Sequence, residues 1–384
     1  MRVLHFAKYS FLRTGGMERH VEVLTRALAA RGVDVTVLSY DPSGKAAPRN
    51  EDGVRIEPVR TLANVSSQSL APRLLTRSRR LAQDHRFDVV HQHWPDPFAH
   101  LAASLLPGRP AQVVSWHTDI LRQRILGPLY QALAPLALVR PDAVIGATNA
   151  HLNSSQIARF APPERCHVIP FGIDVRPFTP TPETLSDARA LRATHGGGPL
   201  VFALGRHVYY KGFDVLIRAM AHVPAVLLLG GEGPLTTTLR RQAAAVGARV
   251  KLVGNIPETQ IASYFHACDV FCLPSVAQTE AFGLVQAEAM ACGKPLVNTA
   301  LNNGVNELAP NDICALTVPP SDHDALATAL RKVLSESHTA MRLGAAGRDR
   351  VNKSFTVDAM VTKTLSLYEM VSSSLSDLTR VDRG

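Results

Sequence analysis

The strongest constraint on the fold is the alternation of short apolar runs with amphipathic segments along most of the chain. Most of these runs are continuous stretches of Val, Ile and Leu rather than apolar–polar alternations. That pattern is typical of strands buried on both faces of a parallel sheet. We expect strands at residues 3–7, 33–39, 89–93, 113–116, 143–147, 167–170, 200–204, 225–229, 250–253, 270–273 and 295–298.

The segments between the runs carry a helical period. Residues 17–31 place Val21, Leu24 and Leu28 on one face and end at Gly32, a typical glycine stop. Repetition of strand, helix and strand predicts an α/β fold in which helices cover both faces of doubly wound parallel sheets.

The chain has 384 residues, which is too long for one ordinary core, so two domains are expected. The strand–helix rhythm breaks across residues 170–199, which carry five prolines and a glycine triplet. We therefore predict an N-terminal domain over residues 1–172 and a C-terminal domain over residues 173–355. Residues 356–384 would form a final helix that packs back on the N-terminal domain, followed by a tail.

Composition narrows the class of protein. A hydrophobic content of 46% excludes a disordered chain, and no apolar stretch is long enough to span a membrane. The start is too interrupted for a signal peptide, and the few cysteines indicate reduced core thiols, so we expect a cytoplasmic protein. The net charge of +9 favours an anionic partner such as a nucleotide, a lipid phosphate, a membrane surface or a nucleic acid.

The stretch "TEAFGLVQAEAMACGKP" at residues 279–295 places Glu280 and Glu288 eight positions apart. It predicts a helix over residues 282–292 that begins shortly after a buried strand. The helix N-terminus would offer free N–H groups to an anion, and Gly283 would allow a phosphate to approach the backbone closely. The two carboxylates suit sugar and ribose hydroxyls. On spacing alone, a helix-dipole role for Glu280 and a buried salt bridge for Glu288 are equally open.

Three further strand-to-helix turns suit a phosphorylated ligand. Arg206 and Lys211 follow the strand expected at residues 200–204, and two cations at the carboxyl end of a strand favour a diphosphate over a merely solvated loop. Glu232 lies in the Gly-rich turn "LLLGGEGPL" near the same predicted crevice. The backbone around Ile256 would read the edge of a base.

The first domain carries weaker signals. Gly15 and Gly16 form a turn that opens a helix and would offer N–H groups to a phosphate. His117 follows a predicted strand, where a single histidine is more often structural than catalytic. His91 and His93 face one side of a strand, but no third ligand lies near them in sequence, so we interpret them as core or pocket-lining residues rather than a metal pair.

Taken together, "GRHVYYKGFDVLI", "GGEGP" and "TEAFGLVQAEAMACGKP" resemble the retaining glycosyltransferases of family 4. "SWHTDILRQ" and "VIPFGID" resemble a bacterial subgroup that builds surface polysaccharides, many members of which use GDP-mannose. The resemblance implies the GT-B architecture, with two Rossmann-like doubly wound parallel-sheet domains that face each other across a cleft. The N-terminal domain would bind the acceptor and the C-terminal domain the nucleotide sugar.

The resemblance also implies roles for single residues. Arg206 and Lys211 would bind the donor diphosphate and stabilise the leaving group, Glu280 would contact the sugar, and Glu288 would hold the ribose. His117 would sit close to the reacting centre. The implied catalytic residues are His117, Arg206, Lys211 and Glu280. The implied nucleotide-sugar site comprises Gly15, Gly16, Arg206, Lys211, Glu232, Ile256, Glu280, Phe282, Gly283, Leu284, Val285 and Glu288.

We expect a hexosyltransferase that moves mannose or a related sugar from a nucleotide diphosphate sugar to a hydroxyl of a glycan or polyprenyl-linked acceptor. It would act in surface polysaccharide or lipopolysaccharide biosynthesis with retained anomeric configuration. No metal or other cofactor is expected, because cations and a helix N-terminus would stabilise the leaving diphosphate. A nucleotide-sugar epimerase of the same architecture and, with least support, a basic nucleic-acid-binding protein are the alternatives.

In residues 72–86, leucines stand beside Arg73, Arg77, Arg79 and Arg80 on a predicted helix. Such a segment would either dock on an anionic membrane surface or expose a solvated face, and both readings stay open. Docking would place this cytoplasmic protein on the inner face of the cell membrane. No nucleic-acid partner is expected.

Overall fold

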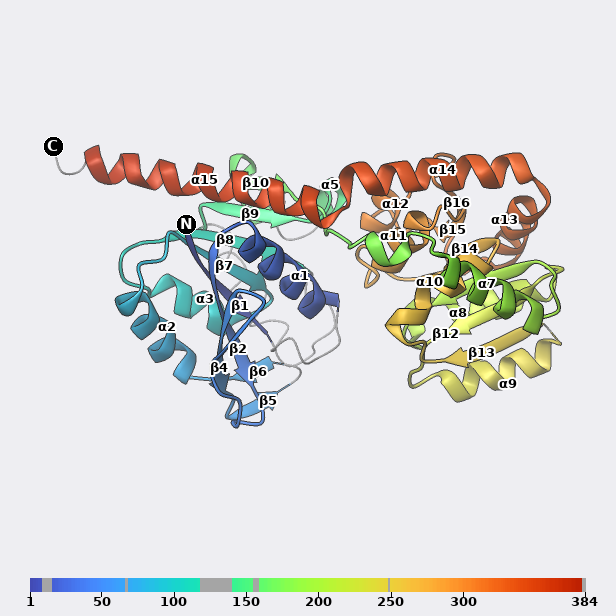
Figure 1. The fold of residues 1–384 in the computed structure, drawn as a ribbon, viewed down its shortest axis with the longest axis horizontal. Coiled ribbons are helices and arrows are strands. Elements are labelled where there is room, and N and C mark those ends of the chain that lie inside the picture. The colour runs from blue at the N-terminus through green and yellow to red at the C-terminus, as the bar shows by residue number, and fades with distance from the viewer. Residues whose placement is uncertain (9–15, 66–67, 118–139, 155–158, 248, 382–384) are drawn as a thin grey trace. The chain divides into compact units, whose positions relative to one another are not determined.

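The computed structural model describes residues 1–8, 16–65, 68–117, 140–154, 159–247 and 249–381. The chain divides into two compact units, of which unit 1 comprises Met1–Gly172 with Val357–Gly384 and unit 2 comprises Ile173–Thr356. Each unit is an α/β sandwich built on a parallel sheet (Figure 1).

Among the described residues, the sheet of unit 1 has eight strands in the order β10-β9-β8-β7-β1-β2-β4-β3, and only β3 runs antiparallel to its neighbour. A separate hairpin joins β5 and β6. The strands are β1 (Arg2–Ala7), β2 (Asp34–Asp41), β3 (Arg49–Glu51), β4 (Val54–Arg60), β5 (Ala63–Val65), β6 (Gln68–Leu70), β7 (Val89–Trp94), β8 (Ala111–Trp116), β9 (Ala143–Gly146) and β10 (Cys166–Val168).

Helices cover both faces of the unit 1 sheet. They are α1 (Gly16–Ala30), α2 (Arg73–Asp84), α3 (Pro97–Ser104), α5 (Asn149–Ser154), the 3₁₀ turn η1 (Pro163–Arg165) and α15 (Val357–Val381). Because strand side chains alternate, Val3 of β1 packs in the core under α1 and α15, whereas Leu4 packs in the core under α2 and α3. The long helix α15, drawn in red in Figure 1, runs beside α1 and brings the end of the chain back to this sheet.

The sheet of unit 2, as far as its residues are described, has six parallel strands in the order β13-β12-β11-β14-β15-β16. The strands are β11 (Leu200–Leu204), β12 (Val226–Gly230), β13 (Val250–Gly254), β14 (Val270–Leu273), β15 (Leu296–Thr299) and β16 (Ala315–Val318). The helices are η2 (Arg176–Phe178), α7 (Pro182–Thr194), η3 (Tyr209–Lys211), α8 (Phe213–Met220), α9 (Thr236–Val246), α10 (Glu258–Ala267), α11 (Leu284–Ala291), α12 (Gly304–Leu308), α13 (His323–Ser335) and α14 (Ser337–Ser354).

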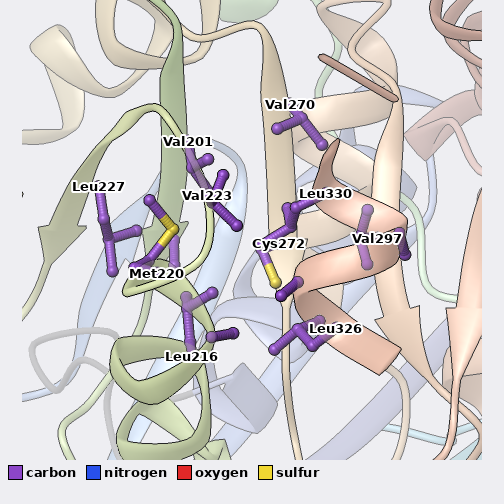
Figure 2. Close-up of a cluster of buried hydrophobic side chains, with 14 of the residues drawn as sticks. Val201, Leu216, Met220, Val223, Leu227, Val270, Cys272, Val297, Leu326 and Leu330 are labelled. Atoms are coloured by element: carbon purple, nitrogen blue, oxygen red, sulfur yellow. The ribbon is translucent and has the colours of Figure 1, made fainter. Parts of the chain in front are cut away.

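The core of unit 2 lies where α8 and α13 pack on the central strands. Leu216 of α8 and Leu330 of α13 are both fully buried there. Figure 2 shows part of this core, with Val201, Leu216, Met220, Val223, Leu227, Val270, Cys272, Val297, Leu326 and Leu330 labelled. This packing holds the carboxyl ends of β11 and β14 in fixed positions.

The continuous apolar runs correctly predicted the buried parallel strands, with ends that differ by one or two residues. Strands β3, β4, β5, β6 and β16 were missed. Strand β4 has the sequence VRIEPVR, in which polar residues and Pro58 break the apolar run, so its pairing with β2 could not be seen. No helix in the described part of the chain is both long and apolar enough to cross a bilayer.

Candidate functional site

The candidate site of unit 2 lies where the winding direction of its sheet reverses. The chain runs from β11 outward to β12 and β13, then returns to place β14 on the other side of β11. In open α/β sheets, ligands bind at the carboxyl ends of the strands at such a switch point. Lys211 comes from the segment after β11 and Glu280 from the segment after β14.

Lys211 and Glu280 form an ion pair across this switch point. The Lys211 Nζ lies 2.5 Å from the Glu280 Oε2, and only 12% and 10% of the two side chains are exposed. Ser275, which is fully buried, donates its hydroxyl to the same carboxylate oxygen over 3.0 Å. The sequence assigned these two residues to different parts of a ligand and gave no sign that they pair with each other.

The backbone of the Glu280 loop is fixed from both sides. The Asn303 amide donates to the Glu280 carbonyl oxygen over 2.8 Å, while its own carbonyl caps α12 by accepting from the Val305 N–H. On the other side, the Val276 N–H donates to the Tyr210 carbonyl over 2.8 Å. The loops after β11 and β14 are therefore hydrogen-bonded to each other independently of the ion pair.

Gly212 explains why glycine follows the lysine. Its φ of +65° lies in the left-handed region, and a Cβ there would lie 2.0 Å from the Pro274 carbonyl oxygen. No side chain fits between these two loops, so the position requires glycine for both conformation and space.

Gly283, just before α11, also adopts a left-handed conformation, and the helix therefore starts later than predicted. Its φ of +69° interrupts the helix, which begins at Leu284 rather than Phe282. Phe282 is buried and packs near Phe355, with 6.0 Å between ring centroids. Leu284 and Val285 occupy the first turn of α11, where backbone N–H groups lack helical partners.

Glu288 lies in the second turn of α11 and is half-buried rather than buried among the alanines around it. The cost of keeping its carboxylate ionised is therefore smaller than the sequence suggested.

Arg206 follows β11 directly and has an exposed side chain. In the described part of unit 2, no ion pair is formed by this guanidinium. Partial burial raises the pKa of Tyr210, on which the charges of Lys211, Glu280 and Arg206 also act. These three charged groups therefore lie within electrostatic reach of one phenol.

The turns after β12 and β13 contact each other, and the turn after β12 also contacts the loop after β11. The Gly231 N–H donates to the Gly254 carbonyl over 2.7 Å, and a Cβ on Gly231 would lie 2.1 Å from the Gly205 carbonyl oxygen. Glu232 is exposed and accepts from the Asn255 amide over 3.2 Å. The half-buried Ile256 packs directly over Gly230.

In its described part, unit 1 holds a cluster of five buried histidines: His5, His20, His91, His93 and His117. His91 and His93 are buried, as interpreted from the sequence, but the expectation that no third histidine lies near them is wrong, because His5 lies opposite His91 on the neighbouring strand. The His93 Nδ1 is 2.9 Å from the His117 Nε2, and the two rings are stacked. Gly16 begins α1, whereas Gly15 lies outside the described residues.

Burial keeps these imidazoles neutral. It lowers the pKa of His5 from its usual value of 6.5 to about 3 and that of His20 to about 4. Burial also lowers the pKa values of His91, His93 and His117 well below that value, and neighbouring histidines add to the effect. A cavity of about 10 Å³, room for roughly one water molecule, lies beside His20, His91 and His117.

Two sets of three histidines have ring nitrogens within 4.8 Å of one another: His5, His91 and His93, and His20, His93 and His117. In both sets the nitrogens of His93 already face other imidazoles, so a metal would have to replace hydrogen bonds. Asp322 of the Asp-x-Asp at residues 322–324 caps helix α13, because its carboxylate accepts from the backbone N–H groups of residues 324 and 325.

Comparison with known families covers both units. Residues 188–350 match the family model of glycosyl transferases group 1, and residues 14–176 match that of Glycosyltransferase Family 4. The O-antigen chain mannosyltransferase C of Escherichia coli is 27% identical over 380 residues, which are 98% of this chain and 100% of the relative. The D-rhamnosyltransferase WbpZ of Pseudomonas aeruginosa is 30% identical over 361 residues, which are 93% and 92% of the two chains.

A solved structure of sucrose-phosphate synthase from Thermosynechococcus elongatus matches with a TM-score of 0.80 at 24% identity. The match covers 97% of this chain and 99% of that one. Together with the two parallel sheets, it confirms the predicted GT-B fold class.

Separating Lys211 from Glu280 should destabilise unit 2. We expect K211M and E280Q each to lower the free energy of unfolding by about 3 kcal/mol, because each leaves one partly buried charge unpaired. A double-mutant cycle followed by urea denaturation should give a coupling above about 1 kcal/mol. The exposed pair Arg218–Asp214 is the control, with an expected coupling under about 0.5 kcal/mol. Equal couplings in the two cycles would contradict the importance of the buried pair.

The histidine cluster should make the fold sensitive to acid. Below pH 6.5 these histidines bind protons in the unfolded chain but stay unprotonated in the folded protein. The free energy of unfolding therefore falls as the pH drops from 6.5 towards 4. Between pH 7 and pH 5, the free energy of unfolding of H20Q should fall by about 2 kcal/mol less than that of the parent protein. Urea denaturation at both pH values measures this difference. H222Q, at an exposed position of unit 2, should leave the pH dependence unchanged. Identical behaviour of the two variants would refute this.

Proposed function

Because the chain belongs to the glycosyltransferases of group 1 and family 4, we propose that it transfers a hexose from a nucleotide diphosphate sugar to a hydroxyl of a glycan or polyprenyl-linked acceptor. Mannose from GDP-mannose, or a related sugar, is the favoured donor. The mannosyl- and rhamnosyltransferase relatives support this choice and a role in surface polysaccharide biosynthesis.

The observation that carries the proposal is the cluster of Arg206, Lys211 and Glu280 at the switch point of the unit 2 sheet. A diphosphate needs cations that are already in place when charge develops on it. Glu280 holds the Lys211 ammonium at a fixed position, and the exposed Arg206 guanidinium forms no ion pair in the described part of the unit. The N–H groups of Leu284 and Val285 would add the positive end of α11.

The remaining roles follow from the same arrangement. Glu288 would hold the ribose, Glu232 would lie near the nucleotide, and the backbone at Ile256 would read the base. While its Oε2 pairs with Lys211, the other oxygen of the Glu280 carboxylate would accept from the sugar hydroxyls. In unit 1, we assign Gly15 and Gly16 to the diphosphate and His117 to the reacting sugar.

The reaction would retain the anomeric configuration and need no metal. The bond from the anomeric carbon to the phosphate oxygen breaks, and the bond to the acceptor oxygen forms on the same face of the sugar. The departing phosphate oxygen takes the proton of the acceptor hydroxyl, so no separate catalytic base is required. The two cations and the start of α11 would carry the negative charge that leaves with the nucleotide.

Arg206 offers the cleanest test, because replacing Lys211 would also break its structural pair with Glu280. We expect R206A to lower the kcat of hexose transfer about 100-fold while leaving the melting temperature unchanged, since the side chain is exposed. Transfer is measured from GDP-, UDP- and ADP-hexoses to a panel of mannosides and rhamnosides, with GDP binding followed by calorimetry. R240A, another exposed arginine of unit 2, is the control.

An unchanged kcat in R206A would contradict the assignment of the diphosphate to this cluster. Turnover of the sugar nucleotide without any acceptor would indicate an epimerase instead of a transferase.

A second cationic site in unit 1 supports docking on an anionic membrane. A cavity of about 430 Å³ beside α2 is lined by Arg60, Arg73, Arg77 and Arg80. Arg77 pairs with the buried Glu57 over 2.6 Å, whereas Arg73 and Arg80 are exposed. These two guanidinium groups suit phosphate headgroups, and such docking would place the enzyme beside a polyprenyl-linked acceptor.

Membrane docking predicts a dependence on lipid charge. Flotation with vesicles that contain anionic lipid should recover the protein, whereas zwitterionic vesicles should not. We expect R73Q/R80Q to weaken binding roughly 30-fold, since each arginine near the surface contributes about 1 kcal/mol. R79Q is the matched control, because Arg79 is exposed on the same helix but does not line the cavity. An equal loss in R79Q would show that the cavity is not the lipid site.

A further inference from the structure

A continuous row of hydrogen-bonded side chains crosses the interior of unit 1. It joins β8, β7, β1 and α15, and every member is buried. In spatial order, the row is His117, His93, His5, Tyr368, His91 and Ser115. The row thus connects a tyrosine of α15, through His5 and His93, to His117, the histidine assigned to the reaction.

The proton positions along this row depend on one another. Each neutral imidazole has one N–H donor and one bare nitrogen acceptor, so the role of one ring nitrogen fixes the role of the other. Because the members follow one another without a gap, the whole row has only two consistent arrangements of protons. One arrangement leaves the His117 Nδ1 bare, and the other leaves it protonated.

The distances around Tyr368 favour one of the two arrangements. Its hydroxyl lies 2.5 Å from the His91 Nδ1 but 3.3 Å from the His5 Nε2. Hydrogen bonds donated by O–H groups are shorter than those donated by N–H groups. The phenol therefore donates to His91 and accepts from the N–H of His5.

The remaining protons follow from His5 towards His117. With its proton on Nε2, His5 accepts through Nδ1 from the His93 Nε2–H over 3.3 Å. His93 in turn accepts through Nδ1 from the His117 Nε2–H over 2.9 Å. On the other branch, the His91 Nε2–H donates to the Ser115 hydroxyl over 2.8 Å.

We propose that Tyr368 is a positioning residue that holds His117 as the Nε2–H tautomer, so that a bare Nδ1 accepts a hydrogen bond from a substrate hydroxyl. The site is then complete only when α15 has packed on the sheet of unit 1. This inference rests on the proposed transferase function for its substrate, but the tautomer itself is a property of the protein alone.

The neutral state of the row agrees with this assignment. Burial raises the pKa of Tyr368 well above 10, so the phenol keeps its proton, and the histidines are neutral for the same reason. A neutral His117 with a bare nitrogen orients a hydroxyl without adding positive charge to the sugar.

The tautomer is measured by long-range ¹⁵N–¹H correlation on full-length protein labelled with ¹⁵N-histidine, without substrate. The resonances of His117 are those that disappear in H117Q. In the parent protein, we expect a bare-nitrogen shift for Nδ1 and a protonated-nitrogen shift for Nε2. In Y368F, both shifts should move towards the average of two exchanging tautomers, because the row has lost the donor that sets its direction.

Two further variants separate positioning from packing. L367A damages the packing of the same helix but keeps the hydroxyl, so the His117 shifts should stay unchanged. H5L interrupts the row one step closer to His117 and should reproduce the tautomer mixture even if Y368F fails to fold. In transfer assays, Y368F should lower kcat about tenfold with the donor KM changed less than twofold.

The inference is overturned if His117 in the parent protein carries its proton on Nδ1, or if both Y368F and H5L leave its tautomer unchanged. If the shifts behave as expected but no variant or parent protein transfers sugar, the positioning role stands and the proposed function fails.

Discussion

The ion pair between Lys211 and Glu280 is the interaction on which the arrangement of unit 2 depends. Two opposite charges that are almost removed from water are stable only while they stay together. Each sits on a different loop, and the loops leave neighbouring strands on opposite sides of the switch point. The pair therefore ties the two halves of the sheet together at the place where a ligand binds in folds of this kind.

The glycines around the pair follow from the same requirement. Gly212 has no room for a Cβ because the loop after β14 touches it, and Gly283 turns the chain so that α11 starts beyond the buried Phe282. Larger residues at these two positions would force the loops apart and separate the charges. The short Lys-Gly and Phe-Gly sequences are thus consequences of packing, and they also leave backbone N–H groups accessible to an anion.

Much of this fold was predictable, because buried parallel strands and glycine stops depend on local sequence. Contacts between strands were not predictable, because they depend on the order of the strands in the sheet, which no local sequence pattern records. His91 and His93 occupy alternate positions on β7, and His5 lies on β1. Their contact can be recognised only when β1 and β7 are known to be neighbouring strands. The pairing of Lys211 with Glu280 and the hydrogen bond between Tyr368 and His91 were hidden for the same reason, because they too join segments far apart in the chain.

The candidate groups of the two units lie in different electrostatic environments. Unit 2 concentrates charged groups at the rim of its sheet, where the exposed Arg206 remains in water until a ligand arrives. Unit 1 places neutral, buried imidazoles and a phenol in a row. Protonating any of these imidazoles would place a positive charge in the protein interior, which is energetically unfavourable. A diphosphate needs the first environment and a hydroxyl needs only the second. Assigning the departing charge to the cations of unit 2, and the neutral hydroxyl to His117 of unit 1, as we propose, is therefore consistent with the chemistry of each side.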